Sequence, residues 1–404
     1  MMHRRFQSRR HECPVFPVRR SAALLIVWIL LLFAPGVFAQ APSPTVSKAP
    51  VTAQQLADYQ KQLADYNAAR QAFDGMADPY WASIAQKRTA RNAKRSSGQA
   101  IVLEDYVLTQ PPVYSGQPKP VDPSAVTVEV VPKPLPVVAD FLAAALSEFQ
   151  FVPSKPKSEI EFKKAYAKAA ATAGLTRDQA TRIFGFEAGG NGTYTVQAGL
   201  EVDKPGAHAI STALGYNQLL ATNSVELLAE QGDQFVKRLQ GRAAGMTGQQ
   251  KADLERKISI LQAMISYSKS VPDKWEAHEQ LGTTPKGLGI HALNLDLDIG
   301  PLLQTQKLLN SVIFAKAKGF DRPLTAAELE MMNLTGDGNG FDMVSMPQTM
   351  RPQVPTSNFF ARSGYERNPV AIRNNVVSAL LAATDKKMDI EVELPGARDL
   401  AASF

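Results

Sequence analysis

Eight prolines fall between residues 111 and 136, and they limit what this part of the chain can form. Proline has no amide hydrogen to donate to a strand ladder, so a set this dense excludes central β-strands. The apolar residues between the prolines, including the run AVTVEVV, favour an extended arm of short edge strands and polyproline II conformation over residues 100–137. The core of the fold must therefore come from the segments on either side.

Helix signals dominate from residue 138 onward. Ser158 precedes a helix-like run with Glu161 three residues later, and Gly174 stands at its end. Thr176 and Gln179 repeat the same spacing before the run RDQATRIFGFE. Further helices are expected at 224–240, 250–270, 300–318 and 369–384. The sequence predicts a mainly α protein, with a helical domain at 138–320 and a C-terminal helical extension at 321–404.

Residues 53–99 are predicted to form an N-terminal helical segment. The motif LADY occurs at 56–59 and again at 63–66, so Leu56, Tyr59, Leu63 and Tyr66 share one helical stripe. We expect this stripe, within residues 53–75, to dock against an envelope protein partner. The basic run at 86–99 is interpreted as a solvated helix end or loop.

The first 39 residues have the pattern of a targeting segment. Six arginines precede an apolar run that ends in Val37-Phe38-Ala39, which predicts a signal peptide at 1–39 and a disordered linker at 40–52. An uncleaved anchor helix is the alternative, but the run is short for a bilayer span and Pro35 interrupts it. The single cysteine, Cys13, precedes the apolar run, so the exported chain has no disulfide, which fits a bacterial periplasm.

Cleavage after Ala39 also changes the charge balance. Residues 40–404 contain 38 Lys and Arg against 37 Asp and Glu. A chain this close to neutral gives no reason to expect nucleic acid or a membrane surface as a partner after cleavage.

We expect the mature protein to begin at Gln40. Intact-mass spectrometry of the protein recovered from its own host measures this directly. A mature chain that retains residues 20–39 would contradict cleavage and favour the anchor helix.

Glu187 is the candidate catalytic residue. It closes the helix that begins after Thr176, where the negative end of the helix dipole disfavours ionisation. Phe184 and Phe186 flank it, and partial burial beside them should raise the pKa of its carboxyl group. A carboxylic acid with a raised pKa can serve as a general acid near neutral pH.

A small-residue turn follows about thirty residues later, in the stretch STALGYNQLLATNS. It presents an aromatic ring at Tyr216 and an amide at Gln218 after Gly215, and Thr222 or Ser224 can cap a helix that starts at Val225. The intervening residues TYTVQAGLEV are expected to form a short β hairpin.

These two elements resemble those of the lysozyme-like soluble lytic transglycosylases. That family places a catalytic Glu at a helix end, followed by a turn of the form Gly-Leu-Met-Gln and another helix. Here Glu187 matches the first motif and Gly215-Tyr216-Asn217-Gln218 matches the second, with Tyr-Asn in place of Leu-Met. The residue after the Glu is Ala188 where the family usually has Ser, and Ala292-Leu293-Asn294 matches the third motif, Ala-Tyr-Asn, without its tyrosine.

The resemblance implies a lysozyme-like domain that cleaves the bond between N-acetylmuramic acid and N-acetylglucosamine in peptidoglycan. Glu187 would act alone as general acid and then base, and no metal or cofactor is implied. The residues implied to bind the glycan strand are Ser211, Gly215, Tyr216, Gln218, Thr222 and Asn294.

Two other functions stay open at the level of sequence. The same fold without catalysis would be a glycan-binding protein or a structural part of an envelope complex. A calcium-stabilised adaptor would use the loop 333–343, but Met346 stands where an EF-hand needs Glu. We therefore expect a tight turn there rather than a calcium site.

Overall fold

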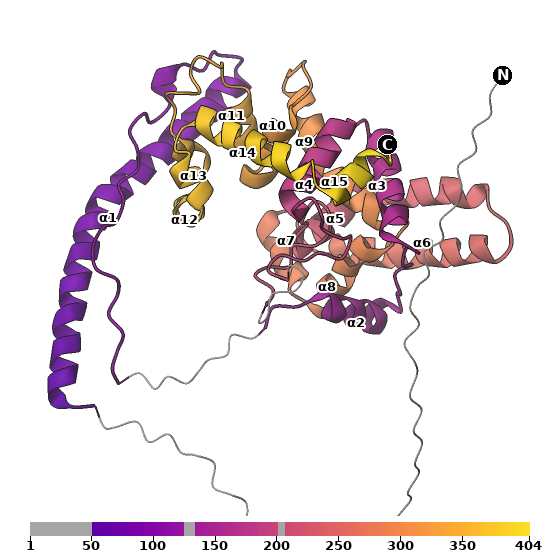
Figure 1. Cartoon of the computed structure of the whole chain (residues 1–404), viewed down its shortest axis with the longest axis horizontal. Coiled ribbons are helices and arrows are strands. Elements are labelled where there is room, and N and C mark those ends of the chain that lie inside the picture. Colours follow the sequence, from indigo (N-terminus) through magenta and orange to yellow (C-terminus); the bar gives the residue numbers. More distant parts are fainter. Residues whose placement is uncertain (1–50, 125–133, 201–206) are drawn as a thin grey trace, which may run out of the picture. The chain divides into compact units, whose positions relative to one another are not determined.

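The computed structural model describes residues 51–124, 134–200 and 207–404 (Figure 1). The expected signal peptide, most of the linker and the AVTVEVV run lie outside these residues. Within them, Ala53–Phe404 form one unit. No helix of the described part of the chain is both long and apolar enough to cross a membrane.

The chain is mainly helical, as the sequence predicts. The α-helices are α1 (Ala53–Ser96), α2 (Val138–Phe149), α3 (Glu159–Ala173), α4 (Arg177–Ala188), α5 (Ala221–Ala244), α6 (Gly248–Ser268), α7 (Trp275–Gly282), α8 (Pro285–His291), α9 (Gly300–Ala317), α10 (Ala326–Thr335), α11 (Asp337–Val344), α12 (Arg362–Glu366), α13 (Pro369–Arg373), α14 (Val377–Glu391) and α15 (Pro395–Ala401). Three 3₁₀ turns, η1 (Leu103–Asp105), η2 (Ala292–Leu295) and η3 (Thr356–Phe359), connect them.

The predicted cap residues set the ends of α3 and α4. The Ser158 hydroxyl accepts a hydrogen bond from the Glu161 amide at 3.3 Å, and Gly174 ends α3 with φ +86°. Thr176 and Gln179 form the expected reciprocal capping box on α4. These local bonds fix where α4 ends and therefore where Glu187 lies.

Two apolar clusters form the core. The first joins α3, α4, α9, α10, α11, α14 and α15 with the Tyr106 ring, and the second joins α2, α5, α6, α8 and the start of α9. The C-terminal helices thus share a core with α3 and α4 rather than packing only among themselves. Gly185 shows how closely they approach, because a Cβ there would lie 3.1 Å from the Glu391 side chain.

The expected β hairpin is not formed by the described residues. Between Val196 and Leu219 the structure has only isolated bridges, Gln197 with Leu214 and Leu214 with Leu219. Residues 201 and 202 of the expected hairpin lie outside the described residues. The first part of the arm, residues 106–122, is extended without strands, and the Asn358 side chain bonds both the amide and the carbonyl of Val107.

Three other expectations differ from the structure. The predicted helix 369–384 is two helices, α13 and α14. Between them the Asn375 carbonyl accepts from the Thr356 amide and the Val377 amide donates to the Val354 carbonyl, across the Pro355–Val376 bridge. Helix α5 begins at Ala221 rather than at Val225, and the Asn223 side chain accepts from the Leu220 amide at 3.1 Å. The loop expected at 333–343 is mostly helix, because α11 starts directly after Gly336.

The basic run at 86–99 is only in part a solvated helix end. Its residues 86–96 form the last turns of α1, and the Arg91 side chain is fully buried, with its Nε 2.7 Å from an Asp342 carboxylate oxygen. Arg95 contacts the other oxygen at 2.6 Å, and Arg88 donates to the carbonyls of Asn358 and Phe360. This run attaches α1 to η3 and α11.

Candidate active site

Glu187 is the penultimate residue of α4 and is half-buried. Gly189 turns the chain out of the helix with φ +65°, which a side chain would disfavour. The next residue, Gly190, packs directly against Glu391 and Leu394, so a Cβ there would clash with α14 and the segment that follows it. This glycine therefore serves the packing of the C-terminal helices.

The C-terminal helices supply the immediate partners of Glu187. The Asn333 side-chain amide, from α10, donates to Glu187 Oε1 at 3.2 Å. Lys387 of α14 contributes a positive charge nearby; its Nζ donates to the Phe186 carbonyl at 3.0 Å and lies 4.1 Å from the centre of that ring. Glu187 is thus enclosed by elements that lie about 150 to 200 residues downstream in the sequence.

A second carboxyl group, that of Glu330, lies beside Glu187, and each group influences the pKa of the other. Its side chain is fully buried, and no N–H or O–H donor among the described residues satisfies its carboxyl oxygens. Two ionised carboxylates buried side by side repel each other, so a proton on one of them is favoured. In this pair Glu330 is the fully buried member and Glu187 the half-buried one.

Burial is the main cause of the pKa shift at both groups. It raises the pKa of Glu187, against the lowering influences of the bond from Glu330 and the charge of Lys387. Burial, followed by the neighbouring Glu187 charge, raises the pKa of Glu330 well above its ordinary value. Burial therefore favours the protonated form more strongly at Glu330 than at Glu187.

Sequence reasoning missed Glu330, Asn333 and Lys387. One local signal was present for the first: Glu330 stands between Leu329 and Met331 in the run LEMM, and both neighbours are buried. A glutamate inside so apolar a stretch of helix is unusual unless a partner satisfies it. Nothing local pairs it with Glu187.

The turn that contains Gln218 is held in place by its backbone conformation and by hydrogen bonds within the protein. Gly215 has φ +80°, and a Cβ there would clash with the Gln304 amide. Gln218 has φ +44°, and its side-chain nitrogen donates to the carbonyls of Gly215 at 2.8 Å and Val196 at 3.2 Å. No hydrogen bond joins Gln218 to Glu187 in the described structure.

Tyr216 does not lie where a sugar could stack on it. Its ring is fully buried against Phe184, at 4.6 Å between ring centres, and against Phe162 and Tyr166. Its hydroxyl donates to the Glu159 carboxylate, which also accepts from the Tyr194 amide at 3.0 Å. The implied contact of Tyr216 with a glycan is therefore replaced by a core role that holds the turn against α3.

Asn294 is also fully buried and belongs to an internal polar network. Its amide donates to Ser224 Oγ at 2.9 Å, and its oxygen accepts from Gln304 at 2.8 Å. His291 Nδ1 lies 2.9 Å from the same Ser224 Oγ, and burial lowers the pKa of His291 to about 4, so its ring is neutral at pH 7. All three side chains are sealed from solvent, so this serine–histidine contact stabilises the fold and is not a nucleophile.

The remaining residues of the predicted glycan set lie beside this network. The Ser211 hydroxyl is half-buried and accepts from the Ala213 amide at 3.1 Å. Thr222 is buried in the first turn of α5. The structure thus gathers Ser211, Gly215, Gln218 and Thr222 around one turn, while Glu187 faces α10 and α14.

The residues of the 333–343 stretch are engaged within the protein. Asp342 accepts from Arg91 and Arg95, and the Asp337 carboxylate accepts from Ser311 at 2.6 Å. Among the residues described, no group of three or more His, Cys, Asp and Glu side chains is placed to hold a metal ion. Asp342 therefore serves as an ion-pair partner.

Comparison of this chain with protein-family models, with curated proteins and with solved structures found no match. The interpretation of the site therefore depends on its own geometry and on the sequence motifs.

Proposed function

We propose that this protein is a periplasmic peptidoglycan lytic transglycosylase with a lysozyme-like helical domain, in which Glu187 is the catalytic acid and base. The observation that carries the proposal is the pair formed by the half-buried Glu187 and the fully buried Glu330, each with a raised pKa. A carboxyl pair with one shared proton and raised pKa values is the kind of arrangement that acid–base catalysis needs. The order of a Glu at a helix end, a Gly-x-x-Gln turn and a following helix also supports it.

In this mechanism Glu330 passes the proton of the pair to Glu187, and Glu187 gives it to the glycosidic oxygen as the bond to the muramic acid anomeric carbon breaks. The ionised Glu187 then takes the proton of the muramoyl 6-hydroxyl while its oxygen bonds to that carbon, which gives an anhydro sugar. Glu330 is fully buried and cannot touch a sugar, so only one carboxyl group acts on the substrate. Its part is to return a proton to Glu187 and to keep the pKa of Glu187 high.

The release of anhydro-muropeptides from purified peptidoglycan, compared between the wild type and Glu187→Gln, tests the proposal.

The alternative is a catalytically silent glycan-binding or envelope-complex protein of the same fold. The burial of Tyr216 and Asn294 favours this alternative, because neither side chain can contact a glycan strand. Absence of product from wild type and variant alike, with glycan binding retained, would select this alternative.

Replacing Glu330 with Gln is expected to remove a pH dependence of stability. The folded pKa of Glu330 lies above its unfolded value, so its stabilising contribution is complete below about pH 4.5 and is lost as pH rises toward the folded pKa. Gln has no proton to lose and can still donate to Glu187. We expect equal stability near pH 4 and a variant more stable by about 1–3 kcal/mol at pH 8, measured by urea unfolding.

Glu328, two residues earlier on α10, provides a matched control. Arg322 and Arg351 lower the pKa of its carboxyl group despite its burial, so its contribution is present at neutral pH and is lost as pH falls. Glu328→Gln should therefore destabilise the protein at pH 7. If Glu330→Gln and the wild type keep the same pH dependence, Glu330 does not hold the shared proton.

A further inference from the structure

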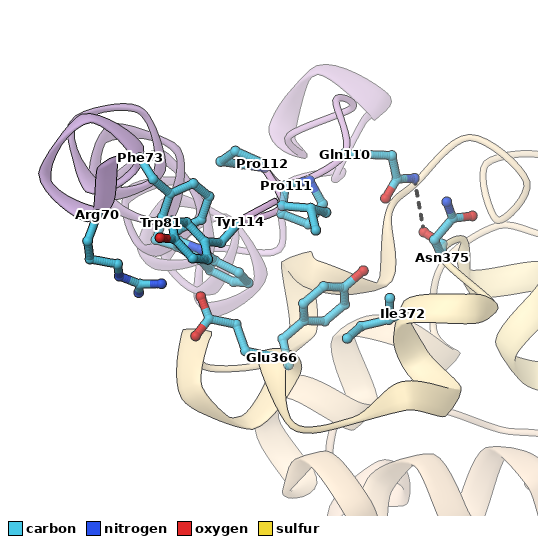
Figure 2. A pocket seen from close by; sticks show the side chains of 12 residues that line it. Arg70, Phe73, Trp81, Gln110, Pro111, Pro112, Tyr114, Glu366, Ile372 and Asn375 are labelled. Carbon is cyan, nitrogen blue, oxygen red and sulfur yellow. Dashed lines mark hydrogen bonds between the residues drawn. The ribbon is translucent and has the colours of Figure 1, made fainter. Parts of the chain in front are cut away.

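A cleft of about 350 Å³ opens between α1, the extended segment 110–114 and the helices α12 and α13 (Figure 2). Neither Glu187 nor any residue of the Gln218 turn lines it. We propose that this cleft is a second ligand site and that it binds a neutral, β-linked pyranose oligosaccharide. The proposal goes beyond the acid–base function of Glu187 and does not depend on it.

Aromatic rings from three separate segments form the walls. Phe73 and Trp81 come from α1, Tyr114 from the extended segment and Tyr365 from α12. The ring centres of Phe73 and Tyr114 lie 5.3 Å apart, and those of Trp81 and Tyr365 lie 5.7 Å apart. Figure 2 shows the first three of these rings grouped on one side, with Glu366 and Ile372 on the other. Aromatic faces are platforms for the flat C–H faces of equatorially substituted sugars. Trp81 and Tyr114 are half-buried and can offer such a platform, whereas Phe73 and Tyr365 are buried and support them from behind.

The charges in the cleft are already paired, which disfavours an ionic ligand. Arg70 lies 3.3 Å from Asp74 and over the rings of Phe73 and Tyr114, at 5.0 and 5.1 Å. Glu366 accepts from Arg362 at 2.9 Å. An anion or a cation would have to compete with these contacts, whereas a neutral ligand leaves them in place.

The polar groups that remain suit hydroxyl groups. Gln110 and Asn375 both line the cleft, and the Gln110 amide nitrogen donates to the Asn375 backbone carbonyl at 3.2 Å. The Gln110 side-chain oxygen is an acceptor, and the Asn375 side chain offers both a donor and an acceptor. Apolar faces together with a few donors and acceptors at the edges describe a pyranose ring, and the volume is that of a small-ligand site.

Ion pairs and hydrogen bonds hold the two walls together. Arg362, at the start of α12, contacts Asp74 at 2.7 Å and Asp78 at 2.6 Å on α1. The Tyr80 hydroxyl lies 2.7 Å from Ser357 Oγ in η3. The cleft is therefore preformed, and a ligand would not need to order it.

A proline-rich peptide is the competing ligand, since such peptides dock in aromatic-lined grooves. The protein's own Pro111 and Pro112 already form part of this wall, and the cleft keeps exposed amides at its edge. Sugar is therefore the better match, and the peptide becomes one of the outcomes of the test.

Tryptophan fluorescence reports on this site because the chain has only three tryptophans, Trp28, Trp81 and Trp275. The full chain carrying W28F and W275F keeps Trp81 alone. Titration with tri-N-acetylchitotriose is expected to give a saturable change in emission and to protect Trp81 from acrylamide. Adding Gln110→Ala to that chain should weaken binding about fivefold, the effect of one lost hydrogen bond.

The matched control carries W28F and W81F and keeps Trp275, which is 39% exposed on α7 and lies outside the cleft. Its emission should not respond to the sugar. The proposal is overturned if Trp81 gives no response, if only Trp275 responds, or if a proline-rich decapeptide binds and the sugar does not. Binding in an added Glu187→Gln background should be unchanged, so this test and the test of catalysis fail independently.

Discussion

Glu187→Gln is expected to reduce the release of anhydro-muropeptides from purified peptidoglycan by at least about a hundredfold, the usual contribution of general acid–base catalysis. Gln keeps the shape of the side chain and its contact with Asn333 but has no proton to donate. Stability should change little or increase, because burial raises the pKa of Glu187 and ionising it there is unfavourable. Product analysis by mass spectrometry and a urea unfolding curve measure the two effects separately.

Glu148→Gln is the matched control for this experiment. Glu148 is the penultimate residue of α2, as Glu187 is of α4, but its side chain is exposed and belongs to no carboxyl pair. Its substitution should leave product release unchanged. Equal turnover by the wild type and Glu187→Gln would refute the catalytic role.

Local bonds explain which parts of the fold the sequence could predict. The cap residues Ser158 and Thr176 act within three residues of themselves, and both are used as expected. Gly174 likewise ends α3 by its own backbone conformation. The position of Glu187 at a helix end followed from these signals alone.

Long-range contacts explain what the sequence could not predict. Glu330 meets Glu187 across 143 residues of chain, and no periodicity of α10 indicates that encounter. The burial of Tyr216 depends on the side chains of α3 and α4 that surround it, so an aromatic in a small-residue turn could be mistaken for a glycan contact. Pattern predicts which helices form, whereas the partners of a carboxylate or a ring depend on how those helices pack.

Long-range contacts also decide the environment of α1. Its basic C-terminal end is predicted from the sequence to be solvated. Arg91 lies on one helix face with the buried residues Phe73, Ala77 and Ile84. Along the sequence these four residues are spaced four, seven and seven positions apart, which keeps them on one face of the helix. A basic residue continues this apolar face because an acid from α11 neutralises it. Burying a charge is favourable only with such a partner.

Asp342→Asn is therefore expected to destabilise the protein by about 3–5 kcal/mol, because it leaves the buried Arg91 charge without a counter-ion. Arg95 and the Tyr106 hydroxyl bond the other carboxylate oxygen, at 2.6 and 3.1 Å, and they lose its negative charge. A lower urea midpoint and earlier proteolysis within α1 would show the effect.

Two further variants separate the loss of the counter-ion from simple loss of a carboxylate. Asp385→Asn removes the acid of a pair with Arg182 in which the aspartate is 54% exposed, and it should cost less than about 1 kcal/mol. The double variant Arg91→Met with Asp342→Leu removes both buried charges and should recover most of the loss, because apolar side chains of similar size can replace a buried ion pair. If Asp342→Asn costs no more than Asp385→Asn, the Arg91–Asp342 pair does not hold α1 in place.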